Sequence, residues 1–344
     1  MDLKLIFKNK IGLALAGGGA KGAYQIGVFQ ALLELELHRY VKVVSGTSIG
    51  ALNGALFLKD DPELWLNVWK DARFRNFLSS EDDDEDEDEK QKGFPSFREM
   101  QKLFKKSVQK LEEDWERSNG VSDFLLKQNL NLFSQKGLSE VIKKHKALNH
   151  VKKSATELYA CAYNIDTLEP EYFHLNTLNK DTARLALLAS ACIPFMYEPV
   201  TIGEHRYMDG GIKSPLYKED NVDKIPIKPL FDAGCDIIIT VFLSHEDTLD
   251  YSIYPDGDKK VIVELYPTLP LEDFKGAGTF DFFRSSLDER IELGYHDAMF
   301  ILAPMIVKWL QGKSIKEVIE HHNEFNKKNR EKYIKIKKRQ KEQK

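Results

Sequence analysis

The chain has 344 residues, of which 42% are hydrophobic, and a formal net charge of −4. This composition can fill a sizeable core and indicates a globular, soluble protein without a nucleic-acid partner. No run of about 18 apolar residues occurs, and residues 1–10 lack a signal-peptide pattern, so we expect no membrane span and a cytoplasmic location. Three scattered cysteines predict buried thiols rather than a disulfide framework or a metal site.

The chain begins with a predicted strand, helix, strand unit. Ile11–Ala16 is a short apolar run that ends at glycines, residues 24–37 carry apolar side chains at helical spacing, and Val41–Val44 is a second strand. A further helix is expected to start near Ser48, and another after Pro62. This alternation is typical of an α/β fold.

The α/β pattern is then interrupted by two charged segments. Residues 81–89 are nine consecutive acidic residues, which repel one another and favour a solvated surface loop. From about residue 94 to residue 150 the pattern is helical and heavily charged. We predict a helical insertion there that covers part of the fold.

The second half of the chain returns to strands. We predict strands at Glu157–Tyr163, Glu171–Leu175, Asp236–Leu243 and Lys260–Leu265, and a helix around Thr182–Ser190. The predicted fold is therefore a three-layer α/β/α structure with a mostly parallel central sheet.

The C-terminal part is predicted to be helical from about Phe280 to the end. Of its last eighteen residues, Lys327–Lys344, ten are Lys or Arg and two are Glu. Such a basic tail can contact an anionic membrane or micelle surface transiently. We divide the chain into a catalytic domain over residues 8–275 and a helical C-terminal extension over residues 276–344.

Residues 46–50 read GTSIG and satisfy the pattern G-x-S-x-G directly after the second predicted strand. A sharp turn from strand to helix forces its serine outward, and the flanking Gly46 and Gly50 permit that turn. The helix that follows points its positive end at the serine. We therefore predict that Ser48 is a nucleophile at a nucleophile elbow.

The glycines after the first strand have two interpretations. As Gly17-x-Gly19-x-x-Gly22 they fit a dinucleotide-binding turn, but that turn requires an acidic residue about 20 positions later, where Val44 to Gly46 stand. Parallel neighbouring strands would instead place these glycines beside the serine. Their N–H groups would then form an oxyanion hole, with donors from Gly17, Gly18, Gly19 and Ile49.

Four motifs resemble the patatin-like phospholipase family. They are the glycine loop, the elbow, the segment from Ser190 to Phe195, and Asp209-Gly210-Gly211. The resemblance implies a serine acyl hydrolase that cleaves lipid esters with a Ser-Asp dyad and no metal or cofactor. Asp209 would be the base, and Gly210 and Gly211 would let its loop pack closely enough to exclude water and raise its pKa.

Several alternatives remain open at this stage. A histidine-based triad in the order serine, acid, histidine would use His245 or His296, whereas we expect His245 at the surface and His205 in the turn before Asp209. A catalytically silent lipid- or partner-binding relative and a nucleotide-binding module are the other candidates. The function that we expect is hydrolysis of fatty-acyl esters of phospholipids or lysophospholipids through an acyl-serine intermediate.

Overall fold

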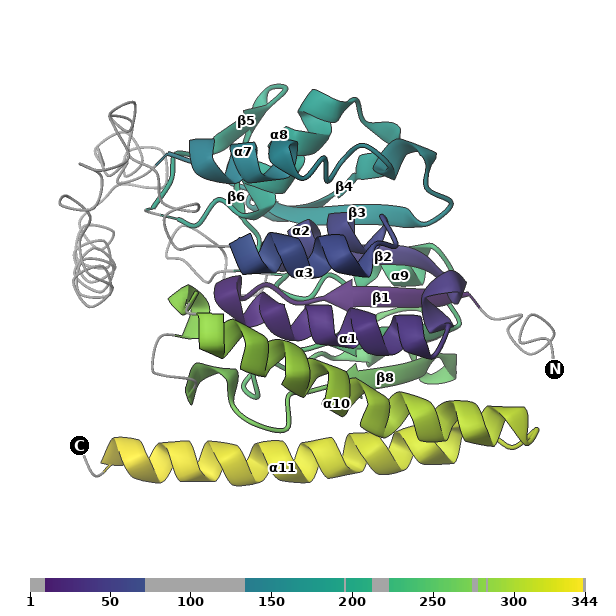
Figure 1. Ribbon diagram of the computed structural model, residues 1–344. Coiled ribbons are helices and arrows are strands. Elements are labelled where there is room, and N and C mark those ends of the chain that lie inside the picture. Colours follow the sequence, from purple (N-terminus) through teal and green to yellow (C-terminus); the bar gives the residue numbers. More distant parts are fainter. Residues whose placement is uncertain are drawn as a thin grey trace.

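The computed structural model describes residues 10–71, 134–194, 196–211, 223–273, 278–282 and 284–342. The predicted acidic loop, the first forty residues of the predicted helical insertion, and Phe195 of the fourth motif lie outside these ranges. Figure 1 draws the described elements as ribbons with their labels.

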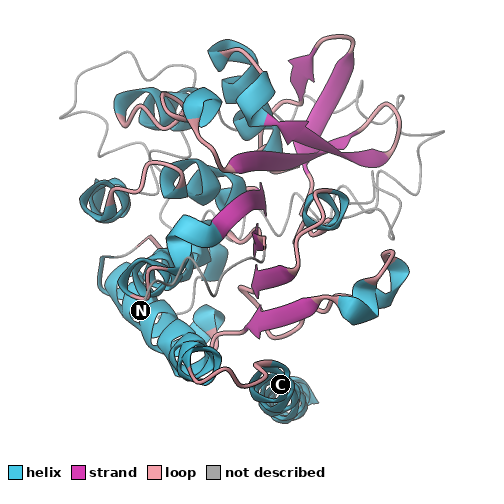
Figure 2. Ribbon diagram, turned by 90° about the vertical axis from the view of Figure 1, so that its right-hand side faces the viewer, coloured by secondary structure: helices cyan, strands magenta, loops and turns pink. Residues whose placement is uncertain are grey.

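The described elements form one mixed sheet flanked by helices (Figures 1 and 2). The strands are β1 (Ile11–Leu15), β2 (Val41–Thr47), β3 (Glu157–Asn164), β4 (Glu169–His174), β5 (Val200–Ile202), β6 (His205–Asp209), β7 (Ile237–Val241) and β8 (Val261–Leu265). The α-helices are α1 (Ala23–Glu34), α2 (Ile49–Phe57), α3 (Pro62–Asp71), α7 (Lys136–Lys144), α8 (Lys180–Ser190), α9 (Lys228–Asp232), α10 (Arg284–Leu310) and α11 (Lys316–Glu342). The short 3-10 helices are η2 (Gly19–Gly22), η3 (Leu37–Tyr40), η4 (Val151–Lys153), η5 (Leu175–Thr177), η7 (Tyr251–Ile253), η8 (Gly257–Lys259), η9 (Leu271–Asp273) and η10 (Gly278–Phe280).

The sheet has the order β5-β6-β3-β2-β1-β7-β8, with β4 also paired to β3. Strands β3, β2, β1, β7 and β8 run parallel to one another, and β4, β5 and β6 add antiparallel pairs at one end. Every residue of β1 and β7 is buried, which explains why both strands read as continuous apolar runs. The predicted α/β fold with a mostly parallel sheet is confirmed.

Strand register brings the predicted site residues to one edge of the sheet. Leu15, at the end of β1, lies opposite Gly46 of β2, so the glycine loop and the elbow leave neighbouring strands at the same edge. Asp209, the last residue of β6, lies opposite Ala162 of the intervening β3. Because β6 runs antiparallel to β3, its carboxyl end points back toward the end of β2.

The prediction that His205 lies in a turn is wrong. His205 is the first residue of β6, which pairs with β5 on one side and β3 on the other. The segment His205–Asp209 is short and begins with two polar residues, so it lacks the apolar run of a central strand. Its strand conformation depends on pairing with residues distant in the sequence.

Helix α10 packs closely on α1. A Cβ on Gly27 would lie 1.9 Å from the carbonyl oxygen of Ile291, and a Cβ on Gly294 would lie 2.0 Å from the carbonyl oxygen of Tyr24. The glycines therefore allow the two helix backbones to approach each other. The first part of the predicted C-terminal extension thus forms one layer with the first helix of the chain (Figure 1).

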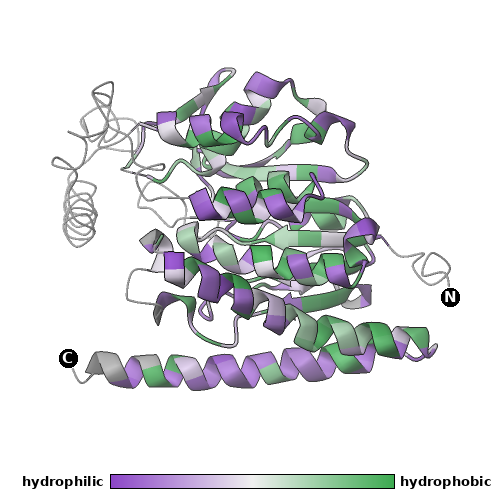
Figure 3. Ribbon diagram, in the orientation of Figure 1, coloured by the Kyte–Doolittle hydropathy of each residue, from purple (hydrophilic) through white to green (hydrophobic). Residues whose placement is uncertain are grey.

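Helix α11 lies beside β8 and is mostly hydrophilic, whereas the strands are mostly hydrophobic (Figure 3). Its Arg330 donates from Nε to the carbonyl oxygen of His245 and from Nη2 to that of Asp247, both at 2.9 Å. The His245 ring is buried against Tyr333, so the prediction of a surface position is wrong. In the described ranges, no helix combines the length and the apolar character that crossing a bilayer requires.

Candidate active site

Ser48 lies between β2 and α2 with φ 57° and ψ −124°. This left-handed φ costs a residue other than glycine roughly 1–3 kcal/mol. A Cβ on Gly46 would lie 2.3 Å from the carbonyl carbon of Gly50, and a Cβ on Gly50 would lie 2.2 Å from the carbonyl oxygen of Leu15. Neither position has room for a side chain. The two glycines therefore permit the tight turn that places Ser48, half-buried, at the carboxyl edge of the sheet.

The glycine loop runs directly beside this serine. A Cβ on Gly17 would lie 3.2 Å from the carbonyl oxygen of Thr47 and 3.4 Å from the Cβ of Ser48. Gly19 has φ 58°, and a Cβ there would lie 2.3 Å from the carbonyl oxygen of Thr279. Gly19 therefore has no room for a side chain, whereas a Cβ at Gly17 would require the loop or the serine turn to shift by a few tenths of an ångström.

One of the four predicted oxyanion donors must be corrected. The Gly17 N–H donates to the carbonyl oxygen of Lys224 at 2.9 Å and is therefore already engaged. The N–H groups of Gly18 and Gly19 donate to no acceptor within the ranges that the structure describes. Ile49 is the first residue of α2, where a helical N–H lacks an intrahelical partner. Three candidate donors remain: Gly18, Gly19 and Ile49.

Asp209 is 1% exposed and lies within reach of the serine. Its carboxylate accepts a hydrogen bond from the Gly211 N–H at 2.8 Å and interacts with the Ser48 hydroxyl. Burial raises the pKa of Asp209 to about 6, although both of these interactions and the positive charge of Lys224 lower it. The structure therefore brings together a serine hydroxyl and a buried carboxylate that is a stronger base than an ordinary aspartate.

The glycines after Asp209 let its loop pack on the sheet. A Cβ on Gly210 would lie 3.1 Å from the Cys161 Sγ atom, and a Cβ on Gly211 would lie 3.1 Å from the Thr47 Cγ2 atom. Both contacts are tight for a Cβ, so a larger residue would push the loop away from β3 and β2. This close packing keeps water from Asp209, which agrees with the expected effect of the two glycines.

Ser190 positions the elbow, a role that sequence reasoning did not assign to it. Its hydroxyl accepts a hydrogen bond from the Ser48 N–H at 2.8 Å and donates to the carbonyl oxygen of Cys161 at 2.5 Å. Nearby, the Asp209 N–H donates to the carbonyl oxygen of Cys192 at 2.8 Å. The end of α8 thus connects the serine turn to the aspartate strand. The only sequence signal was that Ser190 opens the fourth motif.

Residues 223–227 cross the ends of β1 and β2 and hold them together. Besides the Gly17 contact, the Thr47 hydroxyl donates to the carbonyl oxygen of Asp223 at 2.8 Å. The Ser45 hydroxyl donates to the carbonyl oxygen of Pro226. This segment explains why Gly17 is unavailable to a substrate, because its N–H serves to fix the segment in place.

Lys21, within the glycine loop, does not face the serine as a free cation. It is 6% exposed, and its Nζ atom pairs with the Glu272 carboxylate at 3.1 Å. Burial lowers the pKa of Lys21, and the Glu272 charge partly opposes that effect. The pair joins the loop to the segment between β8 and α10.

The two histidines considered for a triad make other contacts. His245 packs against Tyr333 of α11, and His296 is 67% exposed on α10, where it faces Glu292 at 3.8 Å. The Asp209 carboxylate interacts with Ser48, with the Gly211 N–H and with the positive charge of Lys224. The geometry therefore favours the dyad over a histidine-based triad.

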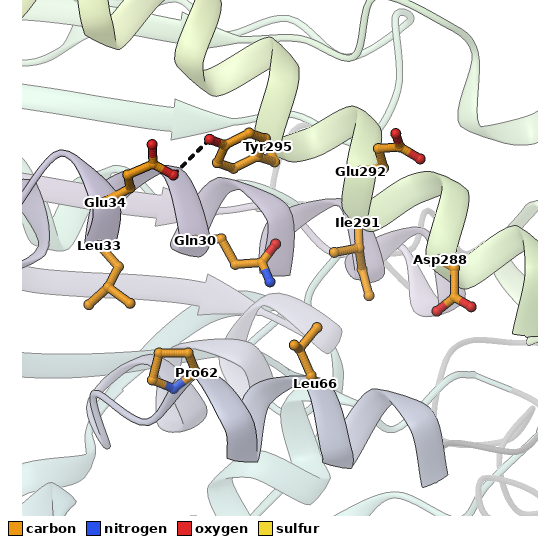
Figure 4. Close-up of a pocket in the computed structure, with 9 residues that line it drawn as sticks. All are labelled: Gln30, Leu33, Glu34, Pro62, Leu66, Asp288, Ile291, Glu292 and Tyr295. Atoms are coloured by element: carbon orange, nitrogen blue, oxygen red, sulfur yellow. Dashed lines mark hydrogen bonds between the residues drawn. The ribbon is translucent and has the colours of Figure 1, made fainter.

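A groove of about 570 Å³ opens between α1, α3 and α10 (Figure 4). Its floor is partly apolar, and its rim carries carboxylates, one of which, Glu34, accepts a hydrogen bond from the Tyr295 hydroxyl at 2.7 Å. It is lined by Gln30, Leu33, Glu34, Pro62, Leu66, Asp288, Ile291, Glu292 and Tyr295. None of these is a predicted site residue, so the groove is separate from the serine.

Residues 13–217 match the family model for patatin-like phospholipase. The chain belongs to the patatin-like phospholipase family. The matched range contains the glycine loop, the elbow, Ser190 and Asp209, which are the motifs on which the resemblance was based. Patatin-like phospholipases are lipid hydrolases, and membership supports a lipid hydrolase function for this chain.

Curated relatives match over short segments. A lysophospholipase nte1 of Aspergillus terreus is 50% identical over 52 residues, which is 15% of this chain and 3% of that protein. Patatin-like phospholipase domain-containing protein 7 of Rattus norvegicus is 44% identical over 57 residues, 17% of this chain and 4% of that protein. A patatin-like phospholipase domain-containing protein of Caenorhabditis elegans is 48% identical over 77 residues, 22% and 6% of the two chains. The matched segments are thus small parts of much longer proteins.

Solved structures that resemble this chain include VipD from Legionella pneumophila, with 16% identity and a TM-score of 0.43 over 86% of this chain and 67% of that one. Human GIVD cytosolic phospholipase A2, solved with methyl gamma-linolenyl fluorophosphonate, has 12% identity and a TM-score of 0.45 over 94% and 61% of the two chains.

Proposed function

We propose that this chain hydrolyses fatty-acyl esters of phospholipids or lysophospholipids through an acyl-serine intermediate. The observation that supports this most directly is the interaction of the Ser48 hydroxyl with the buried Asp209 carboxylate, whose pKa is raised to about 6. It joins a strained nucleophile elbow to a base in a family of lipid hydrolases.

The first half of the reaction forms the acyl-enzyme. The Ser48 Oγ atom attacks the ester carbonyl carbon while its proton passes to Asp209. The developing oxyanion accepts hydrogen bonds from the N–H groups of Gly18, Gly19 and Ile49, at the positive end of α2. When the intermediate collapses, Asp209 gives its proton to the oxygen of the leaving alcohol, and the acyl group remains on Ser48.

The second half releases the fatty acid. Asp209, again a carboxylate, accepts a proton from water as the water oxygen attacks the acyl-serine. Collapse breaks the bond to Ser48 Oγ, which takes the proton back from Asp209. No metal or cofactor is needed in this scheme, because the same carboxylate moves the proton in both halves.

The proposal is tested by measuring fatty-acid release from short nitrophenyl esters, monoacylglycerols, lysophospholipids and phospholipids. We expect release from the lipid esters by the wild type. Ser48→Ala and Asp209→Asn should each lower the rate by about 10²–10⁴-fold, the usual contribution of nucleophile activation and general-base catalysis.

Asp223→Asn provides the matched control for Asp209→Asn. The Asp223 carboxylate is half-buried, and desolvation also raises its pKa to about 6, but it accepts a hydrogen bond from the Tyr172 hydroxyl at 2.5 Å. Asp223→Asn should keep most of the activity. A wild type that releases no fatty acid would instead support the catalytically silent relative, and full activity of Asp209→Asn would overturn the dyad.

We further propose that α11 contacts the lipid surface that carries the substrate. Lys328, Lys332, Lys335 and Arg339 are exposed and recur at spacings of four, three and four residues, so they form one basic stripe along the helix. The carboxyl half of α11 extends toward the side of the molecule where β1 and β2 end (Figure 1). This position would let the basic stripe and Ser48 approach one anionic surface together.

A further inference from the structure

Both ends of the glycine loop are held by buried side-chain amides. Gln25, on α1, donates from Nε2 to the carbonyl oxygen of Ala16, the residue before the loop, at 2.8 Å. Asn53, on α2, donates from Nδ2 to the carbonyl oxygen of Gly22, the residue that ends η2, at 3.0 Å. Gln25 is 0% exposed and Asn53 is 1% exposed. At such positions an unmet hydrogen bond would be costly, so these contacts fix the backbone on both sides of the candidate oxyanion donors.

The two amides are also joined to each other and to an indole. The Asn53 Nδ2 atom donates to the Gln25 Oε1 atom at 2.8 Å, and the Trp69 Nε1 atom donates to the Asn53 Oδ1 atom at 3.0 Å. An indole N–H can only donate. The acceptor of this bond must be the Asn53 Oδ1 atom, so the Asn53 NH₂ group faces Gly22 and Gln25. The Gln25 Oε1 atom accepts from Asn53, so the Gln25 NH₂ group faces Ala16. The Trp69 N–H thus sets the orientation of both side-chain amides.

The same residues connect the glycine loop to the helix that follows the nucleophile. A Cβ on Gly22 would lie 2.5 Å from the Ile49 Cγ1 atom and 3.1 Å from the Asn53 Nδ2 atom. Ile49 carries the third candidate donor, and Asn53 lies one turn further along α2. The backbone N–H groups of the loop and of the start of α2 are thus held in fixed positions relative to each other.

We infer that Gln25, Asn53 and Trp69 are positioning residues that hold the oxyanion donors of Gly18 and Gly19 in place. We call them the amide clamp. The inference rests on the proposed function, because the donors matter only if an ester is attacked by Ser48. The clamp touches neither the substrate nor the reacting atoms. It acts through the backbone of the loop, and its loss should affect the transition state more than substrate binding.

The test is Trp69→Phe, with Trp65→Phe as the matched control. Both indoles are buried on α3 and donate one N–H bond, that of Trp65 to the carbonyl oxygen of Leu56 at 2.8 Å. A purely structural role predicts similar falls in melting temperature and similar kinetics. We expect Trp69→Phe to lower kcat about tenfold with KM nearly unchanged. Complete loss of an oxyanion donor lowers kcat by about 10²–10³-fold, and a donor that is only displaced should cost less. Trp65→Phe should keep the wild-type kcat.

Gln25→Met gives a second variant, which removes the bond to Ala16 while preserving side-chain volume. It should also lower kcat, and slow the reaction of Ser48 with a fluorophosphonate, at a temperature where the protein is folded by circular dichroism. The wild type could be active while Trp69→Phe and Gln25→Met have the same kcat as Trp65→Phe. That result would overturn the role of the amide clamp and leave the proposed function standing. If the wild type hydrolyses no ester, both proposals fail.

Discussion

At the scale of single residues, Asp209 combines a chemical advantage with a cost to stability. Burial raises its pKa to about 6, which makes its carboxylate a better proton acceptor than a solvated aspartate. The carboxylate must nevertheless be ionised to accept the proton from Ser48. The activity of the enzyme should therefore follow the titration of this one group.

We expect kcat/KM to rise with pH through an apparent pKa near 6 and then to reach a plateau. Below that pH Asp209 is protonated and cannot act as a base. The measurement is the pH dependence of hydrolysis of a neutral, soluble ester, whose own charge does not change. A rise centred near pH 4 would mean that Asp209 is not desolvated in the working enzyme.

The same pKa predicts a stabilising substitution. The pKa of Asp209 is about 6 in the folded chain and 3.8 for an ordinary aspartate. The contribution of this group to stability is therefore complete below pH 3.8 and is lost as the pH rises through 6. Asp209→Asn removes the buried charge, so its free energy of unfolding at pH 8 should exceed that of the wild type by at most roughly 3 kcal/mol. Urea unfolding at pH 8 and pH 4 measures this. An equal difference at both values would contradict the assignment.

Ser48 and Asp209 could be predicted as candidate site residues because each lies in a short motif whose chemistry depends on neighbours along the chain. Gln25 and Asn53 could not, because an amide inside an apolar helix carries no spacing signal and its partners are backbone carbonyls. Gly17 was assigned the wrong use for a related reason. Glycine spacing shows where backbone N–H groups could be available. It does not show that the Gly17 N–H is bonded to Lys224, which lies about two hundred residues further along the chain.

At the scale of elements, the elbow depends on the contact between α2 and the end of β1. Gly50 is the residue at which the helix backbone meets the strand, since its Cβ would lie 2.2 Å from the carbonyl oxygen of Leu15. The strained φ of Ser48 persists because this contact and the bond to Ser190 hold the turn from both sides.

Gly50→Ala should therefore displace the start of α2. We expect a loss of about 2–4 kcal/mol in the free energy of unfolding. The fall in kcat should be about 100-fold, because small misplacements of a reacting group are costly. Gly203→Ala is the control, with φ 64° and nothing within 4 Å of its Cβ. It should cost about 1 kcal/mol and leave kcat unchanged. Wild-type kcat in Gly50→Ala would contradict the account of the elbow.

The parallel strands were predictable because apolar runs next to glycines identify buried strands. Strand β6 was not, because its five residues begin with two polar side chains and lack an apolar run, and only pairing with β3 and β5 makes it a strand. That omission matters for the site. It is the antiparallel direction of β6, rather than the Asp-Gly-Gly motif itself, that carries Asp209 back to Ser48.

At the scale of the whole molecule, α11 is tied to the site by a short series of contacts. Arg330 bonds the backbone of the segment after β7, and in that segment the Asp247 carboxylate pairs with the Lys224 Nζ atom at 2.7 Å. Lys224 in turn accepts the Gly17 N–H through its carbonyl oxygen. A basic helix was predictable from composition, whereas its attachment through Arg330 depends on tertiary contacts that composition does not encode.

The proposed contact of the basic stripe with a lipid surface is tested by reversing charges on α11. Lys332→Glu with Lys335→Glu should weaken binding to vesicles that contain phosphatidylserine by at least about tenfold, since each basic residue near such a surface contributes about 1 kcal/mol. Hydrolysis of a soluble ester should not change. Lys313→Glu with Lys316→Glu makes the same change in charge just before and at the first residue of α11, and should have little effect. Equal binding by the two double variants would contradict a role for the basic stripe.

The central claim is that Ser48 is the nucleophile and Asp209 its base. It is tested most directly by treating the protein with a fluorophosphonate and locating the adduct by peptide mass spectrometry. We predict one adduct, on Ser48, in the wild type, no adduct in Ser48→Ala, and much slower labelling of Asp209→Asn than of Asp223→Asn. An adduct on another residue, or labelling that survives Ser48→Ala, would contradict the account.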